Sequence, residues 1–153
     1  MQIFTDLEQF ERVTAGRPKW VRTAQAIRVA ASHREGVMHS IGDSLTYLRT
    51  RRRHETDLFT GHRRYLEVIA AGDAPVHLEI AAKRDLISGT DDSAQYSDLT
   101  DREHFTGTGQ ELTLQPGQIV VVEIDEAVRY RKAAAQPCTV LHVSVEGTTF
   151  PNK

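Results

Sequence analysis

The stretch Gly61-His62-Arg63-Arg64-Tyr65-Leu66-Glu67-Val68-Ile69-Ala70-Ala71 decides the fold class, because it joins a polar turn to a run of β-forming residues. From Tyr65 onward the side chains are aromatic, β-branched or small and apolar, which favours a strand. Successive side chains of a strand point to opposite faces. We therefore expect one face to carry Tyr65, Glu67 and Ile69, and the other to carry Leu66, Val68 and Ala70.

Similar short runs lie on both sides of this strand. They predict further strands at residues 45–51, 76–81, 111–114, 118–124, 128–131 and 139–146. Turn signals such as Gly42-Asp43, Gly72-Asp73 and Pro116-Gly117 separate several of them. Residues 88–110 are poor in aliphatic side chains, which predicts a long excursion with at most one short strand.

The first 35 residues have helical spacing instead. Thr5-Asp6-Leu7-Glu8 fits a capping box, in which the Thr5 hydroxyl would accept from the Glu8 amide. Gly16 is a stop signal for this first helix, and Pro18 is tolerated in the first turn of a second one. Apolar residues then recur every three or four positions up to Ala31, so two amphipathic helices are expected within residues 5–31.

Two helices followed by about eight strands predict a mainly β chain of the α+β class. Such strands close most easily as a sandwich or a jelly-roll barrel, and the spacing leaves these two open. The length of 153 residues is typical of one domain. We expect a single domain over 1–153, with the helices packed on a barrel formed by residues 37–150.

The composition excludes several classes of protein. With 19 Lys and Arg against 21 Asp and Glu, the net charge of −2 argues against binding to nucleic acid. The mean hydropathy is −0.42, and no apolar run approaches the roughly 18 residues of a membrane span. Residues 1–10 have no apolar core of a signal peptide, and the single cysteine, Cys138, cannot form an internal disulfide. A cytoplasmic location is expected.

The strongest candidate for chemistry is His62 with Glu67. If a bend or bulge brings them together, and a second histidine joins them from a neighbouring strand, they would form a metal or acid–base site inside a β structure. The alternative interpretation is a solvated, charged turn that leads into a half-buried strand, since motifs this short occur often by chance.

The other histidines and charged groups are less specific. Alternation places His142 on one strand face with Val140 and Ser144, where it would line a polar cavity or be a satisfied core histidine. Glu123 alternates with Ile119 and Val121. His39, before a tight turn, is either a pocket group or a turn-capping group. We expect His33, His54 and His104 in exposed stretches and His77 facing outward.

Two charged segments offer binding alternatives. The basic cluster Arg49, Arg51, Arg52, Arg53 and His54 would bind an anion or form a solvated hairpin end. The segment from Asp98 to Glu103, with Asp101, would bind sugar hydroxyls or form a simple surface loop. Cys138 is expected to be a small buried hydrophobe. The sequence has no phosphate-binding glycine loop, nucleophile elbow or CxxC pair.

Three longer stretches indicate a family. They are Ile3-Phe4-Thr5-Asp6-Leu7-Glu8-Gln9-Phe10, His39-Ser40-Ile41-Gly42-Asp43-Ser44-Leu45-Thr46-Tyr47 and Leu58-Phe59-Thr60-Gly61-His62-Arg63-Arg64-Tyr65-Leu66-Glu67-Val68. Supporting stretches are 98–103, 117–120, 124–127, Arg129-Tyr130 and Phe150-Pro151-Asn152-Lys153. With these motifs the chain resembles the YhcH/YjgK/YiaL family over nearly its whole length, and within it the small (beta) subunits of a beta-galactosidase.

This resemblance implies a cupin-like jelly-roll barrel, a double-stranded β-helix, with two N-terminal helices and a homodimeric state. It implies a carbohydrate-related accessory subunit that supports a large catalytic beta-galactosidase chain, or alternatively a sugar anomerase or isomerase. No carboxylate pair fits a glycosidase, so we expect no lactose hydrolysis by the chain alone.

The residue patterns and the resemblance together give a set of expected site residues. Catalytic roles fall to His62, Glu67, Arg64 and Tyr65. Ligand-binding roles fall to His39, Asp101, Glu103, Glu123, Arg129 and His142. His62 and Glu67 would be the ligands of a divalent metal such as zinc. Ile69 and Val128 occupy positions where many family members have Gln or His, so His39, His142 or Glu123 would have to complete a metal site.

Overall fold

The structure is a computed structural model that describes residues 1–42, 45–52, 57–131 and 136–145. Several sequence features lie outside these ranges: the turn residue Asp43 and its neighbour Ser44, Arg53 and His54 of the basic cluster, Glu146 of the last predicted strand, and the motif 150–153.

Twelve strands, two α-helices and two short 3₁₀ helices make up the described chain. The α-helices are α1 (Leu7–Val13) and α2 (Pro18–Ala30), and the 3₁₀ helices are η1 (Lys83–Asp85) and η2 (Asp92–Ala94). The strands are β1 (Gln2–Phe4), β2 (His39–Ile41), β3 (Leu45–Arg52), β4 (Phe59–Gly61), β5 (Tyr65–Ala71), β6 (Val76–Ala82), β7 (Ile87–Ser88), β8 (Glu103–Thr106), β9 (Gln110–Leu114), β10 (Ile119–Val122), β11 (Glu126–Tyr130) and β12 (Gln136–Ser144).

Both predicted helices are present, but the first one is capped differently. The N-cap is Asp6, whose side chain accepts from the backbone N–H of Gln9 at 2.7 Å, and the Gln9 side chain accepts from the Thr5 N–H at 2.6 Å. The capping box predicted on Thr5 and Glu8 is therefore wrong by one residue, because Asp6 and Gln9 supply the same pair of groups one position later. Gly16 has a positive φ of 82°, and Pro18 opens α2.

The strands pair into two antiparallel sheets of six. The first has the order β1-β10-β5-β12-β3-β2, and the second has the order β7-β8-β4-β11-β6-β9. The short strands β1, β2 and β7, together with β9, end the sheets, so the described strands form two packed sheets and not one closed barrel. The prediction of a mainly β chain with two helices is confirmed, and the jelly-roll arrangement stays a prediction.

The strands missing from the sequence prediction are the short ones. β1, β2, β4, β7 and β8 have two to four residues each, which is too few to show alternation. Of these, β8 lies in the segment 88–110, for which the sequence pattern allowed one short strand without placing it. β5 has the predicted bounds, whereas β12 begins three residues earlier than predicted and β10 is shorter at both ends.

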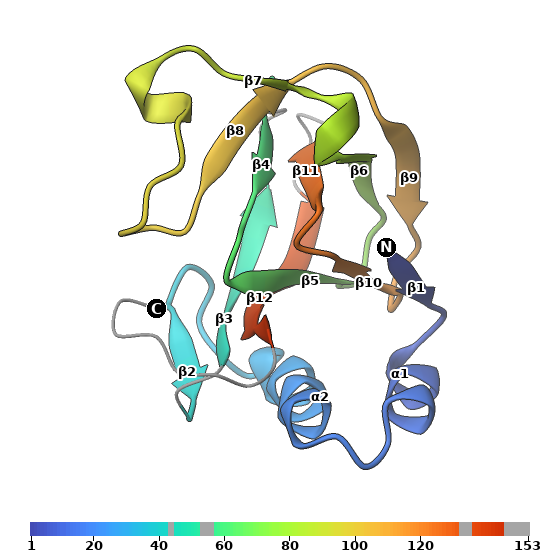
Figure 1. Ribbon diagram of the computed structural model, residues 1–153. Coiled ribbons are helices and arrows are strands. Elements are labelled where there is room, and N and C mark those ends of the chain that lie inside the picture. Colours follow the sequence, from blue (N-terminus) through green and yellow to red (C-terminus); the bar gives the residue numbers. More distant parts are fainter. Residues whose placement is uncertain (43–44, 53–56, 132–135, 146–153) are drawn as a thin grey trace.

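The molecule has three layers (Figure 1), with the helices against one face of the first sheet and the second sheet against its other face. Leu66, Val68 and Leu141 pack with Phe10 and Trp20 under the helices. Ile69 and Val140 pack with residues of the second sheet. The alternation predicted for β5 and β12 is thereby confirmed, and the odd-numbered residues of β5 face the space between the sheets. No helix among the described residues is long and apolar enough to cross a membrane.

Phe10 joins the helices to the first sheet. Its side chain is fully buried and makes edge-to-face contacts with Phe4 and Trp20, at ring centroid distances of 5.0 and 5.9 Å. We expect Phe10→Ala to lower the free energy of unfolding by about 3–5 kcal/mol, because it leaves a cavity and removes both aromatic contacts. Urea unfolding followed by tryptophan fluorescence measures this. Val13→Ala on the exposed side of α1 is the control, and equal losses for the two variants would contradict the packing described.

Candidate functional site

The chain crosses from one sheet to the other at His62, Arg63 and Arg64. Gly61 ends β4 in the second sheet and Tyr65 begins β5 in the first. This crossing is the bend that a contact between His62 and Glu67 requires. It leaves His62 at the edge of the space between the sheets. The side chain of His62 is buried.

Three side chains converge in this space. Glu67 and His142 are register partners on the neighbouring strands β5 and β12. Nε2 of His142 lies 3.4 Å from Oε1 of Glu67, and Nε2 of His62 lies 3.8 Å from the same oxygen. The structure thus places two histidines from different elements around one buried carboxylate. The sequence interpretation of a metal or acid–base site required this arrangement, and the interpretation of a solvated turn did not.

Asp101 fixes the orientation of His62. The Nδ1–H of His62 donates to the backbone carbonyl of Asp101 at 2.6 Å, and because a carbonyl only accepts, the Nδ1 atom must hold the proton. Nε2 faces Glu67, with a free lone pair when the ring is neutral and with the second proton when the ring is charged. A histidine held in this way is typical of metal ligands and of general bases.

The carboxylate of Asp101 holds the crossing itself. It accepts from the backbone N–H groups of Arg63 and Arg64, at 3.0 and 3.1 Å, and from the Tyr96 hydroxyl at 2.6 Å. Asp101 has a φ of 53°, in the left-handed region that asparagine and aspartate tolerate best among residues with a side chain. The loop before β8 is therefore locked to the β4–β5 crossing.

The cluster holds a buried negative charge. Burial by itself would raise the pKa of Glu67, but the facing rings of His142 and His62 outweigh it and hold the pKa well below its usual range. Burial by itself would lower the pKa of His62, whereas Glu67 and the Asp101 carbonyl outweigh it and raise the pKa above its ordinary value. Glu67 is therefore an anion whose charge favours protonation of His62.

The donor set fits a divalent transition metal. The ligand atoms of His62, Glu67 and His142 lie within 4.8 Å of one another. Nε2 of His62 and Oε2 of Glu67 are buried and have no hydrogen-bond partner within the described ranges. Two ligand atoms at about 2.0–2.2 Å from one tetrahedral zinc ion are roughly 3.4 Å apart, close to the spacings seen here. Two histidines and one glutamate are also the ligands of catalytic zinc sites that keep one position open.

Two cavities that share Met38, His62, Arg102 and His142 as lining residues form an inner and an outer part of the space beside the cluster. The inner part, about 150 Å³, is lined by all three cluster residues and by the apolar side chains Leu48, Val128 and Val140. The outer part, about 260 Å³, is lined by His62, His142 and Tyr65, with Met38 and Leu99 at its opening. Met38 and Leu99 are exposed to 53% and 74%. The centre is thus buried but reachable by a small molecule.

Of the other residues with expected catalytic roles, Tyr65 lines the outer part, and burial raises the pKa of its hydroxyl. Arg64 is turned toward the neighbouring loop, where its guanidinium donates to the backbone carbonyl of Asp98. Asp101 lines the outer part, but it holds the backbone as described above. Glu103 pairs with Arg63 and Lys83 at 2.9 and 3.0 Å. Arg64, Asp101 and Glu103 thus bond to neighbouring protein groups, which favours a structural role for them. Catalysis was expected for Arg64, and ligand binding was expected for Asp101 and Glu103.

Three predicted ligand-binding residues lie elsewhere. His39 stacks on His33 on the helix side, with ring centroids 4.0 Å apart. Glu123 lines a separate cavity with Val121, and Val121 packs under the helices. Arg129 faces away from the space between the sheets, because its neighbours Val128 and Tyr130 occupy the inner face of β11. The structure does not bring these three residues together with His62.

Histidines 33 and 104 also differ from the sequence expectation of exposed side chains. His33 is half-buried, with Nε2 3.0 Å from the Tyr47 hydroxyl. His104 lines the inner cavity together with Arg102 and Thr60, and its Nδ1 lies 3.2 Å from the Thr60 hydroxyl. Burial, with Arg102 and His62 nearby, lowers the pKa of His104. The sequence contains no signal for this, since His104 pairs with Thr60 across the unpredicted strand β4.

Arg129 has a structural partner in Glu79. Its Nη2 and Nε donate to Glu79 Oε2 at 2.8 and 3.0 Å, and the Gly109 N–H donates to the other carboxylate oxygen. Burial alone would raise the pKa of Glu79, but these donors outweigh it and lower the pKa below 4.5. A lowered folded-state pKa means that this stabilisation is complete above pH 4.5 and is lost as pH falls through the lowered value.

We therefore expect Glu79→Gln to be clearly less stable than the wild type near neutral pH, with the difference shrinking at a second, acidic pH below 4.5. Urea unfolding at the two pH values measures it. Glu111→Gln, on the paired strand β9 and without an ion pair among the described residues, is the control. A difference between Glu79→Gln and the wild type that stays constant with pH would contradict the pairing.

Comparisons with known proteins were made for sequence and for structure. No protein-family model matches the sequence. The structure is similar to protein NMB1881 from Neisseria meningitidis (TM-score 0.45, 14% identity, 76% of this chain and 93% of that one). It is also similar to hydroquinone 1,2-dioxygenase from Sphingomonas sp. TTNP3 with 4-hydroxybenzoate bound (0.46, 16%, 79% and 72%). A third similar structure is the conserved SPY1581 protein of unknown function from Streptococcus pyogenes (0.38, 13%, 71% and 72%).

Proposed function

We propose that the chain binds a small sugar in the cavity between its two sheets and exchanges the sugar's anomers. The observation behind this proposal is the buried cluster of His62, Glu67 and His142 at the bottom of a small open cavity. The cupin-like jelly-roll description and the relation to the YhcH/YjgK/YiaL family belong to the same proposal, and the sequence motifs support them.

Anomer exchange needs one proton acceptor and one proton donor. The anomeric hydroxyl gives its proton to the acceptor, the bond between the anomeric carbon and the ring oxygen breaks, and the ring oxygen takes a proton from the donor. The product is the open-chain aldehyde. Closure on the opposite face, with both transfers reversed, gives the other anomer. Such paired transfers are the work of general acids and bases.

The cluster holds both kinds of group. We assign His62 as the donor, because Glu67 stabilises its protonated form and Asp101 holds its ring in place. His142 in its neutral form is the acceptor, since it is the second imidazole that lines both parts of the cavity. Glu67 lies between the two rings and orients both. Tyr65, Thr60 and Arg102 line the same cavity and would bind hydroxyl groups of the sugar.

His62, Glu67 and His142 would also be the ligands of a divalent metal such as zinc. A bound zinc ion would act as a Lewis acid on an oxygen atom of the sugar. Measuring exchange after dialysis against a chelator, and again after zinc is restored, separates the acid–base role of the two imidazoles from their role as ligands. An exchange rate that does not depend on zinc assigns the proton transfers to the imidazoles themselves.

The resemblance to small beta-galactosidase subunits adds a second role as a proposal. Anomer exchange beside a glycosidase would convert the released sugar to the other anomer, so both roles can belong to one protein. Within the described residues Glu67 is the one carboxylate that lines the inner cavity, whereas a glycosidase needs two. We expect no hydrolysis of lactose by the chain alone, and co-purification with a large beta-galactosidase chain whose activity rises on mixing.

That expectation is checked by size-exclusion chromatography and by hydrolysis assays of each protein and of the mixture. Elution at the size of two chains would support the proposed homodimer. Independent elution of the two proteins and unchanged activity would contradict the accessory role, while leaving anomer exchange to be judged by its own measurement.

A further inference from the structure

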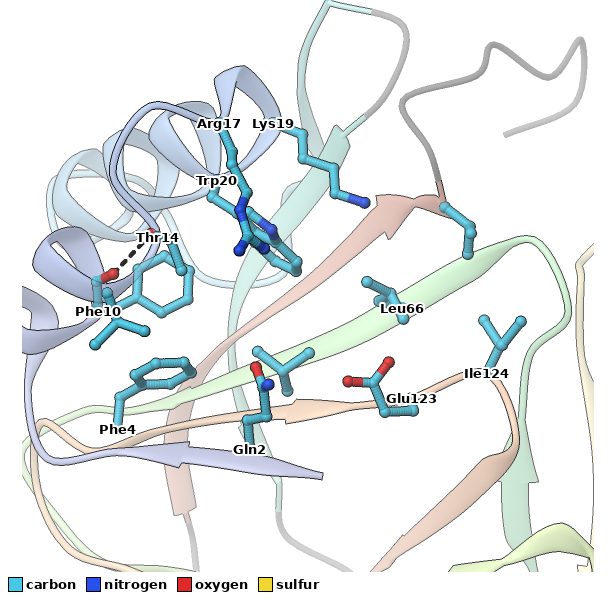
Figure 2. Close-up of a pocket in the computed structure, with 13 residues that line it drawn as sticks. Gln2, Phe4, Phe10, Thr14, Arg17, Lys19, Trp20, Leu66, Glu123 and Ile124 are labelled. Atoms are coloured by element: carbon cyan, nitrogen blue, oxygen red, sulfur yellow. Dashed lines mark hydrogen bonds between the residues drawn. The ribbon is translucent and has the colours of Figure 1, made fainter.

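A second cavity lies on the opposite face of the first sheet from the histidine cluster. Its volume is about 520 Å³, and β5 separates it from the cluster, because Leu66 points into this cavity whereas Glu67 points into the other. The helices α1 and α2 form one wall and the strands β1, β10 and β5 form the other (Figure 2). The mechanism proposed above uses no residue of this cavity.

The bottom of the cavity is apolar and aromatic. Phe4, Phe10, Trp20 and Val121 are buried in the helix-side core and line the cavity together with Leu66. A volume within the range of about 300–1,000 Å³ is typical of sites for small molecules. Polar and charged side chains share the lining with the apolar ones.

Charged groups stand on both walls. Arg17 and Lys19 project from the helix side and Glu123 from the sheet side, as Figure 2 shows. None of the three has an ion-pair partner among the residues that the structure describes. The Nζ atom of Lys19 lies 5.1 Å from the centroid of the Trp20 ring. Two cations and one anion leave a net positive charge over an apolar surface, which is complementary to a monoanion with an apolar body.

We propose that this cavity binds a small amphipathic organic acid. The carboxylate would lie at Arg17 and Lys19, and the apolar body would lie against Phe10, Trp20 and Leu66. Glu123 accepts hydrogen bonds only, so the far end of the ligand would be a donor such as a hydroxyl group. This site is independent of the proposed sugar site, so either one can fail without the other.

Trp20 is the only tryptophan of the chain, so its fluorescence reports directly on this cavity. The experiment titrates the full-length protein with octanoate, ω-hydroxyoctanoate and octanamide below their micelle-forming concentrations. We expect a saturable fluorescence change with octanoate and about tenfold weaker binding of the uncharged octanamide, because the amide loses the charge-assisted contacts. Equal affinity for octanoate and octanamide, or no saturable change, would overturn the proposal.

Variants locate the site. Arg17→Gln with Lys19→Gln is expected to weaken octanoate about tenfold, whereas Arg12→Gln, an exposed cation of α1 that does not line the cavity, leaves binding unchanged. ω-Hydroxyoctanoate is expected to bind more tightly than octanoate, and Glu123→Gln is expected to remove that difference. Glu67→Gln tests independence and is expected to leave octanoate binding intact. An unchanged affinity in the double variant, or a loss of affinity in Glu67→Gln, would refute this assignment.

Discussion

Glu67→Gln is expected to reduce anomer exchange by at least about a hundredfold, the scale of a lost general acid–base arrangement. Glutamine has nearly the same shape as glutamate, but it is neutral. It therefore removes the charge that favours protonation of His62 and that orients His142. Exchange between the two anomers of galactose, followed by NMR with and without the variant, measures the effect.

The matched control is His77→Gln, which removes an imidazole from the second sheet outside the cluster. His77 contacts Thr113 through Nδ1 at 3.2 Å and lines neither part of the central cavity. Its exchange rate should equal that of the wild type. If His77→Gln lost as much activity as Glu67→Gln, or if Glu67→Gln retained full activity while folded, the assignment of the cluster would be wrong.

Asp101→Ala is expected to cause the second large effect, on both stability and exchange. The change leaves the Arg63 and Arg64 N–H groups and the Tyr96 hydroxyl without their acceptor, and it forces alanine into a left-handed conformation. Each buried donor that loses its partner costs about 1–3 kcal/mol. We expect the free energy of unfolding to fall by roughly 3 kcal/mol or more. Exchange should fall as well, because the backbone segment whose carbonyl orients His62 is no longer held to the crossing.

Asp101→Gly and Asp101→Asn separate the effect of the lost hydrogen-bond acceptor from the effect of the left-handed backbone conformation. Glycine tolerates the positive φ but supplies no acceptor, so it should lose stability nearly as alanine does. Asparagine tolerates the conformation and keeps one side-chain carbonyl, and the backbone carbonyl that accepts from His62 is unchanged. Asp101→Asn should therefore recover most of the exchange activity. Full stability in Asp101→Gly would contradict the role of the carboxylate.

The strand alternation of the central sheet could be predicted from the sequence. The period of two in β5 and β12 placed Glu67 and His142 on faces that the structure turns toward the second sheet. Helix α2 could also be predicted, because Pro18 marks its start and apolar residues recur at helical spacing. In each case a run of seven or more residues repeats one pattern, so local preference and burial agree.

The composition of the site could not be predicted in the same way. His62 reaches Glu67 because the chain changes sheets between Gly61 and Tyr65, and that change depends on the pairing of three-residue strand β4 with β8 and β11. His104 enters the cavity through the same pairing. Arg129 and Glu123 were assigned to the site by resemblance, but the sheets turn them to other surfaces. These outcomes depend on contacts between segments that are distant in the sequence, and the periodicity within one segment does not predict such contacts.

The measurement that tests the central claim most directly is the exchange rate between the α and β anomers of a panel of sugars, by NMR, in the presence of the purified wild-type chain. The proposal predicts that at least one sugar exchanges faster than in buffer, in proportion to protein concentration, and that Glu67→Gln abolishes the increase. Exchange rates equal to those in buffer for every sugar, with and without added zinc, would contradict it.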